Sequence, residues 1–187
     1  MPRPMYVANW KMFHSLETAE QWLTWWTEHP LEGAPPESLV VVCPPAPLLF
    51  PMRALIEANR IEHLDLGAQD LHRAFKGAFT GEVSGVSLWS VGAEAVIIGH
   101  SERRTLCGET DEIVAAKMEQ AYLCGLCPIL CIGETADERD AGETEAVLER
   151  QLAGALAHIT EGCLQNRQHD PAWPPFAVAY EPVWAIG

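Results

Sequence analysis

Three side chains that can move or polarise a proton follow short apolar segments of the sequence. Lys11, His100 and Glu181 each come directly after such a segment, and turn-forming residues bound these segments. Short apolar runs of this kind predict buried β-strands. The carboxyl ends of parallel strands lie on one face of a sheet or barrel. A cation, an imidazole and a carboxylate on that face suit proton abstraction beside the carbonyl of an anionic substrate.

Each of these residues also has an ordinary structural interpretation when it is taken alone. Lys11 fits a surface lysine, His100 fits a buried histidine with satisfied hydrogen bonds, and Glu181 fits a salt-bridged glutamate. Ser101 could cap a short helix, and the amino-terminus of that helix would favour a neutral His100 ring that donates to a substrate carbonyl. The case for chemistry therefore depends on the three residues together.

The loop after Glu181 is the second feature that favours a site. Pro182 keeps Glu181 out of helical dihedrals, and the apolar loop that follows ends on Gly187. An apolar loop with a glycine hinge suits a lid. Closure of such a lid would remove water from the Glu181 carboxylate and make it a stronger base.

Strand-like segments alternate with helical patterns along the whole chain. The expected strands are 5–10, 39–43, 63–68, 95–99, 128–133 and 176–180, and the expected helices are 16–28, 47–59, 86–92, 111–124 and 143–162. This alternation predicts a parallel sheet with right-handed crossovers, and strands this apolar predict burial on both faces. Two architectures fit, an open doubly wound sheet and a (βα)8 barrel that is two units short. The first strand lacks a following G-x-G-x-x-G, which disfavours a dinucleotide-binding sheet.

Composition excludes several classes of function. The net charge of -14 argues against nucleic acid and anionic membranes as partners. No apolar run is long enough to span a bilayer, and the amino-terminus lacks the apolar core of a signal peptide. The six cysteines lie mostly in apolar segments, which predicts buried thiols in a reducing cytoplasm. No histidine, cysteine or carboxylate grouping has metal-ligand spacing, so we expect no metal. Residues 1–187 are expected to form one domain.

The segment from Gln69 to Gly85 is long for a loop between a strand and a helix. Loops of this length without periodicity are usually functional or bind a partner. Its tip carries Phe79 between flanking glycines. A second subunit could cover Phe79, or the ring could fold back onto its own domain.

Five segments, in the same order, resemble the triosephosphate isomerase family. They are Asn9-Trp-Lys11-Met12, Gly77-Ala-Phe-Thr-Gly-Glu82, Ile98-Gly-His100-Ser-Glu-Arg-Arg104, Ile129-Leu-Cys-Ile-Gly-Glu134 and Ala179-Tyr-Glu181-Pro-Val-Trp-Ala-Ile-Gly187. The resemblance implies a (βα)8 barrel of which about six units are present. It also implies the cofactor-free interconversion of dihydroxyacetone phosphate and D-glyceraldehyde 3-phosphate through an enediolate, a step of glycolysis and gluconeogenesis.

The resemblance assigns roles to individual residues. Glu181 is the implied base, His100 the neutral electrophile, and Lys11 the cation that supports the enediolate. Asn9 is implied to line the site, and the backbone N–H of Gly187 to hold the substrate phosphate.

Further residues follow by the same resemblance. Ser101, Glu102 and Cys131 are implied to support the site from behind. Thr80, in the loop from Gln69 to Gly85, is implied to reach the active site of a neighbouring subunit in a cytoplasmic homodimer. Phe13 and His14 depart from the asparagine and glycine usual in the family, which alters the loop expected to receive Thr80.

The sequence ends at Gly187, before the rest of the lid and two further strands that the resemblance implies. We therefore expect a C-terminally truncated isomerase whose isolated chain is impaired and prone to aggregate. One alternative is a truncated product with a non-catalytic interaction role. Another is a different sugar-phosphate isomerase or aldolase on a related barrel.

Overall fold

The strands form one curled parallel sheet. The computed structural model describes residues 4–29, 35, 38–165 and 173–185. The described strands are β1 (Met5–Asn9), β2 (Leu39–Cys43), β3 (Asp65–Ala68), β4 (Ala95–Ile98), β5 (Cys127–Ile132) and β6 (Ala177–Tyr180). Each pairs in parallel with the next in chain order. A doubly wound sheet reverses its strand order at a switch point, whereas this order runs one way, as in a (βα)8 barrel.

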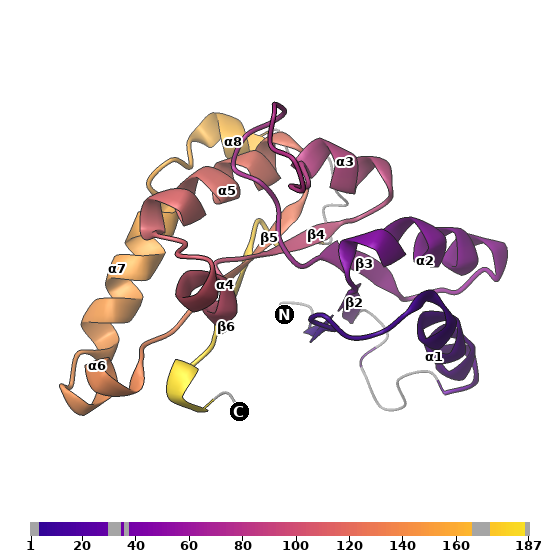
Figure 1. Cartoon of the computed structure of the whole chain (residues 1–187), viewed down its shortest axis with the longest axis horizontal. Coiled ribbons are helices and arrows are strands. Elements are labelled where there is room, and N and C mark those ends of the chain that lie inside the picture. The colour runs from indigo at the N-terminus through magenta and orange to yellow at the C-terminus, as the bar shows by residue number, and fades with distance from the viewer. Residues whose placement is uncertain (1–3, 30–34, 36–37, 166–172, 186–187) are drawn as a thin grey trace.

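Helices lie along the outer side of this curled sheet (Figure 1). They are α1 (Leu16–Glu28), α2 (Ala46–Ala58), α3 (Gly85–Ser90), α4 (Ser101–Leu106), α5 (Asp111–Leu123), α6 (Ala136–Asp140), α7 (Thr144–Leu156) and α8 (Glu161–Gln165), and a 3₁₀ turn spans Val183–Ala185. Within the described ranges, no helix has both the length and the apolar character needed to cross a membrane.

The central strands carry two buried layers of side chains. On β2, Val40 and Val42 pack outward under the helices, while Val41 and Cys43 pack inward. The same alternation continues on β4 and β5, because successive side chains on a strand point to opposite faces. The prediction of burial on both faces is confirmed for these strands.

The same prediction is wrong for the strands at the two ends of the sheet. On β1, Tyr6 is 45% exposed, and on β6, Val178 and Tyr180 are 45% and 50% exposed. Among the described residues, β1 and β6 each pair with one strand only. An edge strand lacks a neighbour that would shield its side chains from solvent.

The predicted helix over 143–162 is two helices in the structure. α7 ends at Leu156, and α8 begins after Thr160, whose Oγ1 accepts a hydrogen bond from the backbone N–H of Cys163 at 3.4 Å. A side-chain cap of this kind starts a new helix. The sequence patterns also missed α6, because five residues are too few to show helical periodicity.

A buried charge cluster ties the long loop to the barrel. Lys117 on α5, 4% exposed at its side chain, pairs with Asp70 and Glu109 at 2.5 Å each. Arg103 on α4 contacts the same two carboxylates. The cluster therefore fixes the start of the loop from Gln69 to Gly85 against α4 and α5.

Phe79, at the tip of this loop, was expected either to fold back onto its own domain or to be covered by a second subunit, and the structure agrees in part with each expectation. The ring lies 4.1 Å from the ring of His72, so it does fold back on its own loop. It nevertheless stays 46% exposed. One face of Phe79 thus remains available to solvent.

Candidate active site

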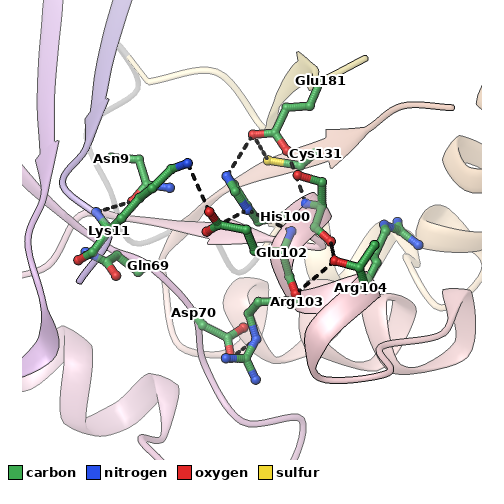
Figure 2. Close-up of polar contacts among 12 residues, drawn as sticks. Asn9, Lys11, Gln69, Asp70, His100, Glu102, Arg103, Arg104, Cys131 and Glu181 are labelled. Carbon is green, nitrogen blue, oxygen red and sulfur yellow. Dashed lines mark hydrogen bonds and ion pairs between the residues drawn. The ribbon is translucent and has the colours of Figure 1, made fainter. Parts of the chain in front are cut away.

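The three residues expected to carry chemistry converge in the structure (Figure 2). His100 Nε2 lies 3.3 Å from Glu181 Oε1, and Lys11 Nζ lies 3.0 Å from Glu102 Oε1 on the same helix start. A cavity of about 650 Å³ opens inside the curl of the sheet and is lined by Asn9, Lys11, His100 and Glu181 among others. Their convergence follows from parallel strands that all end at one face.

Lys11 is held in an unusual backbone conformation. Its φ is 51°, a left-handed value that costs energy for a residue with a Cβ. The N–H of Lys11 donates to Asn9 Oδ1 at 2.9 Å, and Gln69 Nε2 donates to the Lys11 carbonyl at 2.7 Å. Gln69 also donates to the carbonyl of Cys43 at 2.9 Å. These bonds explain how the strained turn aims Lys11 at the cavity.

Gln69 is a site residue that sequence reasoning missed. The sequence pattern marks it only as the start of the long loop. It follows β3 directly, so the rule that selected the other strand ends would have found it.

A backbone hydrogen bond makes Nδ1 of His100 an acceptor. The backbone N–H of Glu102 donates to His100 Nδ1 at 3.2 Å, so that nitrogen acts as an acceptor. The proton of a neutral ring then sits on Nε2, which faces Glu181. The sequence suggested Ser101 as the cap of this helix, but His100 itself is the N-cap and Ser101 is the first helical residue. The cap shifts by one residue because the His100 ring supplies the acceptor.

The Glu181 carboxylate is nearly enclosed, with its side chain 19% exposed. The backbone N–H of Ser101 donates to Glu181 Oε2 at 3.2 Å, and the Cys131 thiol lies 3.3 Å from Glu181 Oε1. Burial, and then the charge of Glu181, raise the pKa of Cys131 well above its usual range. Cys131 is therefore a neutral thiol that donates to the carboxylate, not a nucleophile.

The loop after Glu181 is latched onto a buried carboxylate. Trp184 Nε1 donates to Glu134 Oε1 at 3.0 Å, and Tyr180 Oη donates to both oxygens of Glu134 at 3.1 Å. The Trp184 bond is the main cause that lowers the pKa of Glu134. The Arg139 guanidinium lies 4.1 Å from the centre of the Trp184 ring, a cation–π contact. Glu134 thus anchors the expected lid, a role its place in a motif did not reveal.

Some of the other expected residues lie at the site formed by Lys11, His100 and Glu181, and others do not. Asn9, Glu102 and Cys131 lie within it (Figure 2), and Ser101 belongs to it through its bond to Glu181. Thr80 is exposed on its loop and is not among the residues that line the cavity. Gly187 lies outside the described residues. In the part of the chain that the structure describes, no group of three or more potential ligands could hold a metal ion.

Comparison with known proteins identifies relatives of this chain. The family model described as triosephosphate isomerase matches residues 4–187. A triosephosphate isomerase of Carboxydothermus hydrogenoformans is 41% identical over 187 residues, which are 100% of this chain and 69% of that protein. One of Symbiobacterium thermophilum is 43% identical over the same length and is covered to 68%.

A solved structure agrees with these relatives. The crystal structure of triosephosphate isomerase from Bartonella henselae superposes with a TM-score of 0.78 at 34% identity. It covers 98% of this chain, and this chain covers 69% of it. The described strands therefore have the arrangement of a barrel of this kind.

Proposed function

The chain belongs to the triosephosphate isomerase family, and we propose that its Glu181, His100 and Lys11 carry the proton transfer that interconverts two phosphorylated trioses. The observation that carries this proposal is the convergence of the three side chains on one cavity, with His100 Nε2 at 3.3 Å from Glu181 Oε1. Family membership favours this function over a non-catalytic interaction role or a different sugar-phosphate enzyme.

The geometry suits removal of a proton beside a carbonyl. Glu181 takes the proton from the carbon next to the substrate carbonyl, and the electron pair of that C–H bond moves to form the enediolate. The Nε2–H of His100 donates to the carbonyl oxygen as negative charge develops there. His100 Nε2 gives its proton to the former carbonyl oxygen and takes the hydroxyl proton from the oxygen on the neighbouring carbon. Glu181 then returns its proton to the former carbonyl carbon, which completes the isomerisation. No cofactor is needed, because no net electron transfer takes place.

Lys11 and Asn9 complete the proposed substrate site. The ammonium of Lys11 is the cation beside His100 and pairs with Glu102 across 3.0 Å. In the proposal it shifts its contact toward the anionic substrate, since its side chain is still 36% exposed. We also propose that the backbone N–H of Gly187 holds the substrate phosphate, as the resemblance to this family implies.

A proton-exchange assay tests the roles of these residues. Dihydroxyacetone phosphate is incubated with the 187-residue chain in deuterium oxide, and proton NMR follows loss of the exchangeable C–H signal together with formation of glyceraldehyde 3-phosphate. Removal of a general base typically costs about 10²–10⁴ in rate, so Glu181→Gln should lower both rates by that factor. Glu57→Gln is the control, because Glu57 is exposed on α2 and, among the described residues, forms an ion pair with Arg53 alone.

Two outcomes of this assay contradict the proposal. Equal rates for the parent chain and Glu181→Gln would remove Glu181 as the base. Turnover of larger sugar phosphates, without turnover of trioses, would favour the related isomerase or aldolase.

We also propose that the chain forms a homodimer through the loop from Gln69 to Gly85. Phe79 is 46% exposed on that loop, and Met12 and Phe13 are 95% and 70% exposed beside Lys11. A cavity of about 210 Å³ lined by Lys11, Met12 and Glu102 among others can receive the loop of a second copy. Exposed apolar surface of this kind is typical of an interface.

Sedimentation velocity tests the dimer. Phe79→Asp should shift the chain toward the monomer, whereas Leu164→Asp, at a position 42% exposed on α8, should leave the mass unchanged. Equal masses for all three chains would contradict the proposed interface. We further propose a single domain over residues 1–187 and a cytoplasmic location, which limited proteolysis and cell fractionation test respectively.

A further inference from the structure

Gln151 on α7 makes a paired contact with Gly133, the residue that directly follows β5. Its side-chain Oε1 accepts a hydrogen bond from the backbone N–H of Gly133 at 2.9 Å, and its Nε2 donates to the carbonyl of Gly133 at 3.0 Å. Gln151 is 6% exposed, so both bonds lie away from solvent. One buried carboxamide therefore satisfies both polar backbone groups of a single residue.

Gly133 in turn touches the backbone of Glu181. A Cβ built at position 133 would lie 1.8 Å from the carbonyl oxygen of Glu181 and 2.5 Å from its carbonyl carbon. Non-bonded atoms cannot approach this closely, so only glycine fits at position 133 without displacing Glu181. The N–H of Glu181 also donates to the carbonyl of Ile132 at 2.8 Å. The backbone that carries Glu181 therefore rests directly on the end of β5.

On one side, the contact between Gly133 and Glu181 has no close-packed side chains around it in the described structure. A cavity of about 130 Å³ lies beside it, lined by Gly133, Gln151, Glu181 and Arg104 among others. Close-packed neighbours would fix a backbone segment by themselves, whereas an adjacent void leaves it room to shift. The two hydrogen bonds between Gln151 and Gly133 therefore add to the bond from Glu181 to Ile132 in restraining this backbone.

We propose that Gln151 is a positioning residue for Glu181, acting through Gly133. This inference rests on the proposed role of Glu181 as the base. By fixing Gly133, Gln151 sets the distance between the Glu181 backbone and the end of β5. That distance in turn determines how far the Glu181 carboxylate lies from His100 and Ser101. A base must stand within hydrogen-bond reach of the proton it removes, so a small shift of this backbone would misplace it.

The test uses amide exchange and amide chemical shifts to follow the position of the Glu181 backbone and carboxylate, and it does not depend on turnover. In ¹⁵N-labelled 187-residue chains, Gln151→Met removes both hydrogen bonds at similar side-chain volume. The amide exchange of Gly133 and Glu181 should accelerate roughly tenfold, since loss of buried hydrogen bonds opens the structure locally. The amide signal of Ser101 should also move, because its N–H donates to Glu181 Oε2 at 3.2 Å.

Two further variants keep the test decisive. Gln120→Met is the matched control, because it makes the same change on α5, where the Gln120 Oε1 has no hydrogen-bond partner in the described structure. It should leave the Ser101 signal in place. Gly133→Ala should move the same signal by a different route, since its Cβ displaces the Glu181 carbonyl. If Gln151→Met fails to fold, Gly133→Ala still tests whether this contact places Glu181.

The outcomes separate this inference from the proposed function. An unchanged Ser101 signal in folded Gln151→Met would overturn the inference, as would an unchanged signal in Gly133→Ala if Gln151→Met does not fold. Uniform acceleration of exchange across β2 and β5 would also overturn it, because that result marks a general loss of stability. Equal proton-exchange rates for the parent chain and Glu181→Gln, together with the expected NMR changes, would refute the proposed function while the positioning of Glu181 stands.

Discussion

Lys117→Met is the substitution that most directly tests the buried charge cluster. Lys117 bonds to Asp70 and Glu109 at 2.5 Å each, and its side chain is 4% exposed. Without it, two largely buried carboxylates share the single cation of Arg103. Removal of one partner from a buried ion pair typically costs about 3–5 kcal/mol, because a charge is left uncompensated. Methionine keeps most of the volume of lysine, so a cavity contributes little to this loss.

The loss should be visible in both chemical and thermal unfolding. For a chain of this length, each 1 kcal/mol lowers the midpoint by about 2–4 °C, so Lys117→Met should unfold roughly 6–20 °C lower. Urea unfolding followed by circular dichroism should give the same difference in free energy with an unchanged slope. Arg53→Met is the matched control, because Arg53 and Glu57 form a more exposed pair at 34% and 64% side-chain exposure. Its expected loss is below about 1 kcal/mol.

A loss below about 1 kcal/mol in Lys117→Met would refute the reasoning, because the cluster would then behave as a surface pair. The double variant Lys117→Met/Glu109→Gln sharpens the test. It removes one of the two uncompensated carboxylates and should recover part of the loss. No recovery would show that the cost comes from packing and not from charge.

Three further predictions follow from buried or latched groups. Burial opposes ionisation of Glu109, but hydrogen bonds from Lys117 and Arg103 outweigh it and lower the pKa of Glu109 from 4.5. The stability that the ionised Glu109 provides should therefore be lost as the pH falls below 4.5. Acid titration followed by circular dichroism should show a smaller loss of stability in Lys117→Met than in the parent chain. Cys107 is exposed while the other five cysteines are buried, so a thiol reagent should label one thiol quickly in the native chain and six after denaturation. Trp184→Phe removes the bond to Glu134 and should speed proteolysis after residue 181 while lowering global stability by only about 1 kcal/mol; unchanged cleavage would contradict the latch.

Local pattern was sufficient where a single strand or helix decides the outcome. The bounds of α1 and β2 agree with the sequence prediction, because apolar periodicity and capping residues act within the segment itself. The convergence of Lys11, His100 and Glu181 was also predictable, since the carboxyl ends of parallel strands share a face. The sequence by itself thus determined the strand ends and the residues that they carry.

Tertiary structure decided everything that depends on contacts between distant segments. Gln69 supports the turn at Lys11, Glu134 latches Trp184, and Gln151 holds Gly133 beneath Glu181. None of these partners is near in sequence, and a glutamine or glutamate on a helix or loop carries no signal of the residue it will meet. The sequence also could not distinguish edge strands from central ones, because exposure of β1 and β6 depends on which strands lie beside them. Sequence pattern is a local property, whereas hydrogen-bond partners and burial are set by how the whole chain is folded.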